Sequence, residues 1–113
     1  MASGEDLRRA ALAFDGATEA PHFDRAAFKG ARTFATLAAD GLTANLKLDP
    51  QEQDHLRAAR PDAYAPVPNA WGARGWTTLL LAAVDREELA GALRLAWAHA
   101  RPRPRAGRGR RTA

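Results

Sequence analysis

Residues 42–48 are the segment that most constrains the fold of this chain. Leucine or alanine occupies every second position, and Thr43, Asn45 and Lys47 stand between them. Because the side chains of a β-strand point alternately to its two faces, this pattern predicts a strand with one apolar and one polar face. Asp40-Gly41, just before it, is typical of a hairpin turn. We therefore expect an antiparallel sheet that is buried on one face and polar on the other.

Helices are expected on the buried face of this sheet. Capping residues at Ser3, Asp49 and Asp85 are each followed three residues later by a carboxylate, which is the pattern that starts a helix. Further short strands are predicted around Phe28 and over residues 34–37 and 76–84. The order is helix, three or four strands, helix, one or two strands, helix. It predicts an α+β fold of two layers, with helices packed on an antiparallel sheet.

Net charge divides the chain into two parts. The protein has 113 residues, 17 of them basic and 13 acidic, and a net charge of +4. Residues 101–113 contain six arginines and no acidic residue, which leaves 11 basic against 13 acidic residues in positions 1–100. We predict a single domain over residues 1–100, with a formal charge of −2, and a disordered arginine-rich tail over residues 101–113.

The tail suggests a polyanionic partner. Its arginines alternate with proline and glycine, a composition that can neither bury a core nor continue a helix. A flexible run of this kind can bind nucleic-acid phosphates or an anionic membrane by counterion release. The alternative is a tail that only increases solubility, because charged runs of this kind are not specific.

Enzyme chemistry is not expected from these residues. Ser3 is the only serine and there is no cysteine, which argues against a serine or cysteine nucleophile and a disulfide framework. His22 with Asp24, and Asp54 with His55, lack the spacing of a metal site, so no metal is predicted. No phosphate-binding loop or dinucleotide fingerprint is present, so no cofactor is predicted either. The longest apolar run, residues 79–84, is too short to cross a membrane, and a cytoplasmic location is expected.

Four segments carry a resemblance to a known family. They are Gly16-Ala-Thr-Glu-Ala-Pro-His-Phe23, Arg32-Thr-Phe-Ala-Thr-Leu37, Leu46-Lys-Leu-Asp-Pro50 and Trp71-Gly-Ala-Arg-Gly-Trp-Thr77. In this order and spacing they resemble the MmcQ/YjbR family, over about residues 5–102. The resemblance implies a compact α+β domain similar to secretion chaperones. It also implies a small non-enzymatic protein that binds DNA, although the family label rests on fold more than on chemistry.

Candidate nucleic-acid contacts follow from the cations and exposed rings. Phosphate contacts need flexible cations at a surface, and tryptophan rings can stack on unpaired bases. Trp76 opens an apolar strand and is expected in the core, whereas Trp71 is expected to be exposed. The candidates for DNA binding are Lys29, Arg32, Lys47, Trp71, Arg74, Arg101, Arg103 and Arg105. The alternative function is a module that binds another protein or a small ligand through the sheet face or the Trp71 loop; the sequence does not give the oligomeric state.

Overall fold

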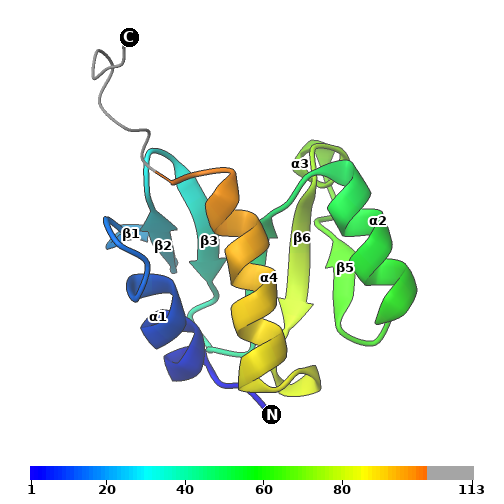
Figure 1. Cartoon of the computed structure of the whole chain (residues 1–113), viewed down its shortest axis with the longest axis horizontal. Helices are drawn as coiled ribbons and strands as arrows, with labels where there is room; N and C mark the ends of the chain where they lie inside the picture. Colours follow the sequence, from blue (N-terminus) through cyan, green and yellow to red (C-terminus); the bar gives the residue numbers. More distant parts are fainter. Residues whose placement is uncertain (102–113) are drawn as a thin grey trace, which may run out of the picture.

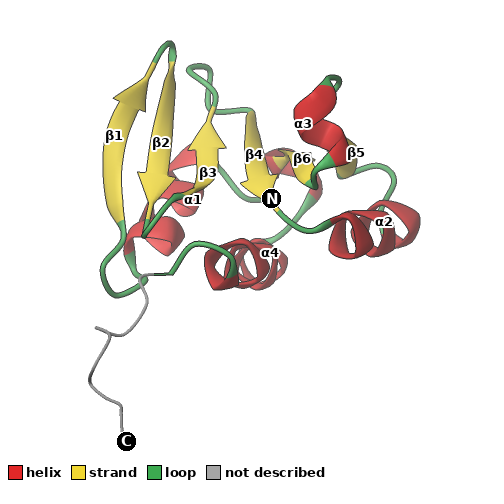
Figure 2. Ribbon diagram, turned by 90° about the horizontal axis from the view of Figure 1, so that it is seen from above, coloured by secondary structure: helices red, strands yellow, loops and turns green. Residues whose placement is uncertain are grey.

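A six-stranded antiparallel sheet carries the three longer helices on one face and leaves the other face open (Figures 1 and 2). The structure is a computed structural model, and it describes residues 1–101. The strands lie in the order β1-β2-β3-β4-β6-β5. The strands are β1 (Thr18–His22), β2 (Arg25–Lys29), β3 (Thr33–Leu37), β4 (Thr43–Lys47), β5 (Tyr64–Pro66) and β6 (Trp76–Leu80). The helices are α1 (Gly4–Leu12), α2 (Pro50–Ala59), α3 (Ala70–Ala73), α4 (Arg86–Ala98) and the 3-10 turn η1 (Leu81–Ala83).

Residues 43–48 have the two faces that their alternation predicts, but Leu42, expected on the apolar face, lies before β4 and is 60% exposed. Ala44, Leu46 and Leu48 are fully buried, and the side chains between them are only partly buried. β4 lies in the middle of the sheet between β3 and β6 and pairs with both. The buried face of the sheet packs against α1 and α4, so the expected two-layer α+β architecture is confirmed.

An aromatic cluster fastens the last helix to the sheet. The Trp97 ring on α4 stacks on Phe14 with 5.0 Å between ring centroids and meets Phe34 edge-on at 5.1 Å. Phe34 reaches this cluster because β2 pairs Phe28 with Ala35 and Lys29 with Thr33, which leaves Phe34 as the extra residue of a bulge. The bulge turns a second consecutive side chain toward the helices.

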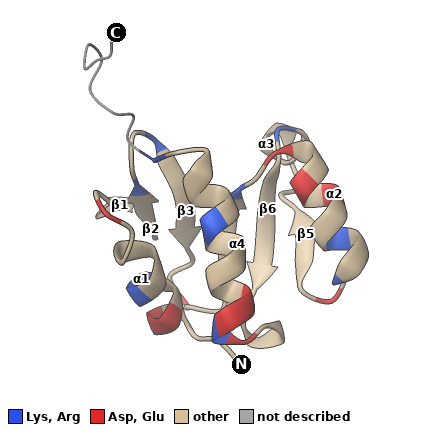
Figure 3. Cartoon of the chain, viewed as in Figure 1, with Lys and Arg blue, Asp and Glu red and all other residues tan. Residues whose placement is uncertain are grey.

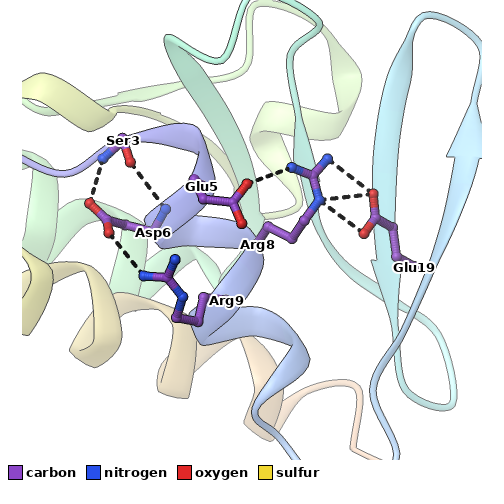
Figure 4. Close-up of polar contacts among 6 residues, drawn as sticks. All are labelled: Ser3, Glu5, Asp6, Arg8, Arg9 and Glu19. Atoms are coloured by element: carbon purple, nitrogen blue, oxygen red, sulfur yellow. Dashed lines mark hydrogen bonds and ion pairs between the residues drawn. The ribbon is translucent and has the colours of Figure 1, made fainter.

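The capping boxes expected for the first two helices are present. In α1, Asp6 N–H donates to Ser3 Oγ and Ser3 N–H donates to the Asp6 carboxylate, as Figure 4 shows. The bond from Ser3 N–H is the main cause of a lowered pKa at Asp6. Asp49 and Glu52 form the same box at the start of α2. Among residues 1–101, no helix is long and apolar enough to cross a membrane.

The predicted order allowed a fourth strand before α2 and a second strand after it, but the sequence did not locate them; α3 was not predicted, and β6 was predicted too long. β1 and β5 are the edge strands of the sheet, and each contains a proline, at Pro21 and Pro66. Edge strands tolerate proline because one side of their backbone has no partner strand, so composition alone gives little sign of them. The four-residue helix α3 lies in the expected loop before Trp76. β6 ends at Leu80 instead of residue 84, and η1 follows it.

Two glycines make a matched test of this packing. A Cβ at Gly30 would lie 2.3 Å from the Ala100 carbonyl oxygen and 2.8 Å from the Trp97 ring, whereas at Gly91 in α4 the nearest atom is 3.7 Å away. Gly30→Ala should lower the free energy of unfolding by about 1–3 kcal/mol through overpacking. Gly91→Ala should raise it by about 0.5–1 kcal/mol through helix propensity. Urea unfolding of both variants measures this, and equal effects would contradict the close contact at Gly30.

Tyr64 should make the stability of the fold depend on alkaline pH. Its ring is buried, its hydroxyl has no hydrogen-bond partner among residues 1–101, and burial raises its pKa to about 12. An unfolded tyrosine ionises near pH 10. Between about pH 10 and 12 the folded state therefore holds more protons than the unfolded state, and stability falls as pH rises.

Tyr64→Phe should remove this dependence. Because the hydroxyl is unpaired, the variant should be as stable as the wild type or more stable at pH 7. Its stability should also fall less steeply above pH 10, as measured by urea unfolding at several pH values. Tyr64 is the only tyrosine, so tyrosinate absorbance reports its ionisation directly. A wild-type pKa near 10, or a marked loss of stability at pH 7 in the variant, would contradict the burial argument.

Candidate binding site on the open sheet face

The open face of the sheet carries basic but no acidic strand residues. The strand register places there Arg25, Lys29 and Lys47 as charged residues, and no aspartate or glutamate, within the described sheet. The remaining positions of this face are Thr18, Ala20, His22, Ala27, Thr33, Thr36, Thr43, Asn45, Ala65, Trp76, Thr78 and Leu80. Residues 1–100 have a formal charge of −2, so the charge of this face differs in sign from that of the domain as a whole.

Acidic side chains lie mainly on the helix layer and in turns. Figure 3 shows them on α1, on α2 and at the start of α4. Glu19 is the only acidic residue within the strands, and it points toward α1, where Arg8 Nε lies 3.1 Å from its carboxylate (Figure 4). The same arginine reaches Glu5 Oε1 at 3.4 Å. The fold therefore keeps the carboxylate of β1 away from the open face.

A cavity of about 480 Å³ lies on this face. The hairpin between β1 and β2 and the short helix α3 both rise from the sheet on its open side, as Figure 2 shows. His22 and Phe23 at the hairpin tip, and Trp71 on α3, line the cavity together with the sheet residues between them. Its other lining residues are Thr33, Thr36, Asn45, Val67, Asn69 and Trp76. The cavity thus joins four aromatic or imidazole rings with neutral hydrogen-bonding groups.

Trp71 is exposed, as its sequence context predicts. Its side chain belongs to α3, whose start is capped by Asn69 through a 2.8 Å bond from Trp71 N–H. The Arg74 guanidinium lies 5.0 Å from the centre of the Trp71 ring, a cation–π contact. Trp71 nevertheless keeps 54% of its surface exposed. A large ring held at the edge of a cavity can therefore contact a ligand.

Trp76 does not lie in the core, which corrects the expectation for it. It pairs with Lys47 across β4 and β6, so its ring lies on the open face, partly buried, and lines the cavity. The apolar run that follows it suggested a wholly buried strand. In the structure only Thr77 and Leu79 of β6 are buried, because they alternate with residues of the open face.

Gln53 fixes the loop that carries Trp71 through hydrogen bonds. This residue of α2 is buried, and its Nε2 lies 3.0 Å from the carbonyl oxygens of Gly72 and Trp76 and 3.1 Å from Thr77 Oγ1. Gly75 fits only without a side chain, since its φ is +108° and a Cβ would lie 1.9 Å from the Leu48 carbonyl oxygen. The loop is therefore a fixed support for the exposed ring.

Lys47 has a structural role that the sequence did not reveal. Its ammonium group donates to the carbonyl oxygens of Leu48 and Arg74, both at 3.0 Å. These bonds tie the end of β4 to the end of α3. An ammonium group has three donors, so Lys47 keeps one for a ligand and is less free than the exposed Lys29 and Arg74.

The described candidate cations gather at one end of the sheet. Lys29 and Arg32 flank the β2–β3 turn, and Arg101 is beside it because Ala31 N–H bonds to the Ala100 carbonyl oxygen at 2.6 Å. Lys47 is the last residue of β4 and Arg74 directly follows α3, and the Lys47 ammonium binds the Arg74 carbonyl oxygen, so both lie at the same end of the sheet. Arg103 and Arg105 lie outside the described residues, together with the rest of the expected tail.

The hairpin tip contains a backbone outlier that sequence analysis missed. Phe23 has a φ of +58°, the only positive value at a non-glycine residue within the described chain. This conformation is unfavourable for a bulky residue. The Phe23 side chain is also 93% exposed, so packing in the core does not compensate for the cost. The only sequence sign was a proline before His22-Phe23-Asp24, which indicates a turn but not its conformation.

His99, at the C-terminal end of α4, is partly buried against α2. Its Nε2 lies 2.8 Å from Glu52 Oε1, and this contact joins the end of α4 to the start of α2. Ligand atoms of Asp49, Glu52 and His99 lie within 4.8 Å of one another. However, both carboxylates already accept backbone N–H groups in the cap of α2. We assign this cluster a structural role at the junction of the two helices.

The fold and cavity define a small two-layer α+β domain with one open sheet face. The family model described as YjbR matches residues 12–99. The chain therefore belongs to the YjbR family, and the family resemblance seen in the sequence is confirmed. The curated proteins contain no match to it.

A solved structure has a similar fold. It is protein DR2400 of Deinococcus radiodurans, with the DUF419 domain of the YjbR-like family. It is 29% identical, with a TM-score of 0.73, over 86% of this chain and 77% of that chain. The similarity shows that the two proteins share a fold. It assigns no ligand or partner to this chain.

Gln53→Leu should loosen the Trp71 loop. The substitution keeps the apolar bulk but removes a donor shared by the Gly72 and Trp76 carbonyl oxygens and the Thr77 hydroxyl; because each of these groups keeps another hydrogen bond, the loss costs about 0.5–1.5 kcal/mol. The free energy of unfolding should fall by that amount, and amide hydrogen exchange should accelerate over residues 70–77. Gln51→Leu, an exposed neighbour in the same helix, is the matched control and should change neither. Equal effects from both variants would remove the special role of Gln53.

Proposed function

We propose that this protein is a non-enzymatic DNA-binding domain that contacts DNA with the open face of its sheet. The observation that carries the proposal is the charge of this face, which has three basic and no acidic strand residues in the described sheet. Phosphate contacts supply most of the affinity of nucleic-acid-binding proteins, and a carboxylate on the same surface would oppose them.

The position of the remaining cations supports this assignment. Arg32, Arg74 and Arg101 are exposed and lie at the end of the sheet where Lys29 and Lys47 also stand. The arginines that follow in the sequence are joined to the domain through Arg101, the last described residue, which lies at this end of the sheet. DNA bound across the open face would therefore lie close to the point where the basic C-terminal segment begins.

One observation favours binding of a partner protein instead. At the opposite end of the sheet a broad hollow of about 1070 Å³ is lined by residues that include Met1, Phe23, Leu42 and Leu80. All four side chains are exposed although they are large and apolar. Exposed apolar patches often mark protein interfaces. This second function would use a different end of the molecule from Lys29, Lys47 and Arg74, whereas Arg25 also lines this hollow.

Charge substitutions on two surfaces test the DNA proposal. The double variant Lys29→Gln/Arg74→Gln removes one exposed cation of the open face and one of the α3 loop beside it. Its control, Arg57→Gln/Arg94→Gln, makes the same change of net charge with exposed residues of α2 and α4. The open-face variant should bind DNA more weakly, and the slope of log affinity against log salt should fall by about 1.4–1.8. The control should bind like the wild type.

Fluorescence anisotropy with a labelled oligonucleotide at several salt concentrations provides the measurement. A chain ending at Ala100 separates the domain from its basic C-terminal segment. If this shortened chain binds no DNA at low salt, the open face does not bind DNA and the partner-protein function is favoured. Equal losses in the two double variants would likewise show that only net charge matters.

A further inference from the structure

The two walls of the open-face cavity each contribute exposed rings to its lining. Phe23 and His22 come from the β1–β2 hairpin, and Trp71 comes from α3, some 48 positions later in the chain. Trp76 and the hydroxyls of Thr33 and Thr36 form part of the lining between them. Rings that face a common space from two separate elements are suited to hold a flat, ring-shaped group by stacking.

The strain at Phe23 indicates that its ring has a function. A positive φ at a non-glycine residue costs of order 1–3 kcal/mol, and such outliers cluster at binding and active sites. Glycine would adopt the same backbone conformation without this cost. Phe23 gains almost no burial in return, since it is 93% exposed. Among residues 1–101 the only ring that it meets is that of His22, at 4.8 Å between centroids, so most of its surface is left free to contact a ligand.

Polar groups of the cavity can recognise the edge of such a group. Asn45 Oδ1 accepts a 2.9 Å hydrogen bond from Thr78 Oγ1, which orients the amide so that its NH₂ group is the part left to donate. Thr36 Oγ1 is already an acceptor for Arg25 Nε at 2.8 Å. The described lining contains no carboxylate. A neutral heterocycle with hydrogen-bond acceptors on its edge fits these groups better than a cation does.

Cations lie beside the cavity, where they can bind the phosphate groups of a nucleotide whose base is in the cavity. Lys29 pairs with Thr33, a lining residue, and Lys47 pairs with Trp76, another. Arg74 lies against the Trp71 ring. A strand whose base entered the cavity would therefore bring its phosphates near these three side chains. Aromatic rings for bases next to cations for phosphates are the pattern of single-strand binding proteins.

We propose that this cavity holds an unpaired base of single-stranded DNA between Phe23 and Trp71. The proposal rests on the proposed DNA-binding function and names its substrate class. In a duplex both faces of each base are covered by its neighbours, so a duplex base cannot enter between two protein rings. Only single-stranded DNA, or a base turned out of a helix, offers the free ring faces that the cavity needs.

The test compares a single-stranded oligonucleotide with the duplex of the same sequence, using the full chain at fixed salt. The wild type should bind the single strand at least tenfold more tightly. Trp71→Ala and Phe23→Gly should each weaken single-strand binding about tenfold, within the range of about 5- to 150-fold expected for loss of one stacked base. Neither should change duplex binding by more than about twofold, because phosphate contacts remain.

Melting temperatures and a control variant distinguish a loss of binding from a loss of folding. Both rings are exposed, and Phe23→Gly relieves the positive φ, so neither variant should lower the melting temperature. Leu12→Ala removes an exposed apolar side chain from α1, on the helix layer, and should leave both affinities unchanged.

The outcomes separate the two proposals. Equal affinity for single strand and duplex, or variants that bind single strands like the wild type, would overturn the base-binding cavity while leaving DNA binding in place. A wild-type protein that binds neither form would overturn both. A loss of single-strand affinity in Leu12→Ala as large as in Trp71→Ala would also reject the cavity as the cause.

Discussion

The whole architecture depends on covering one face of a six-stranded sheet. The apolar side chains of the central strands, such as Leu46 and Leu79, are removed from water by α4 and its neighbours. Burial of this kind is the dominant favourable contribution to folding. The three longer helices all lie on that face, and only the short α3 rises on the other. The second face consequently carries the polar and charged positions of the alternating strands and is available for binding.

Separation of charge follows from the same one-sided covering. The helices bring most of the acidic residues to their own layer, where several serve as caps or ion-pair partners. Glu19, within a strand, turns toward Arg8 of α1. The open face retains Arg25, Lys29 and Lys47 without a counterion of its own in the described sheet. A domain with a negative formal charge can in this way offer a surface that attracts phosphates.

The two walls of the cavity differ: the wall with Trp71 is rigidly supported, and the wall with Phe23 contains a strained backbone. Gln53 and Lys47 bind carbonyl oxygens of the segment 70–76, so Trp71 stands on a loop that is fixed by buried or partly buried hydrogen bonds. On the opposite wall, Phe23 is exposed in an unfavourable backbone conformation. One wall is thus preorganised by bonds to the core, and the other keeps a strained residue where glycine would be more stable.

The sequence by itself determined the elements whose signals are local. The alternation of residues 42–48 gave a half-buried strand, and the caps at Ser3, Asp49 and Asp85 gave three helices, because side-chain periodicity and capping act within a few residues. Tertiary structure alone decided which groups meet. Trp76 faces the cavity because of its register with Lys47, and His99 meets Glu52 from 47 positions away. Phe23 joins Trp71 only because the hairpin and α3 rise from the same face of the sheet. Such contacts depend on strand order and sheet curvature, which no short stretch of sequence encodes.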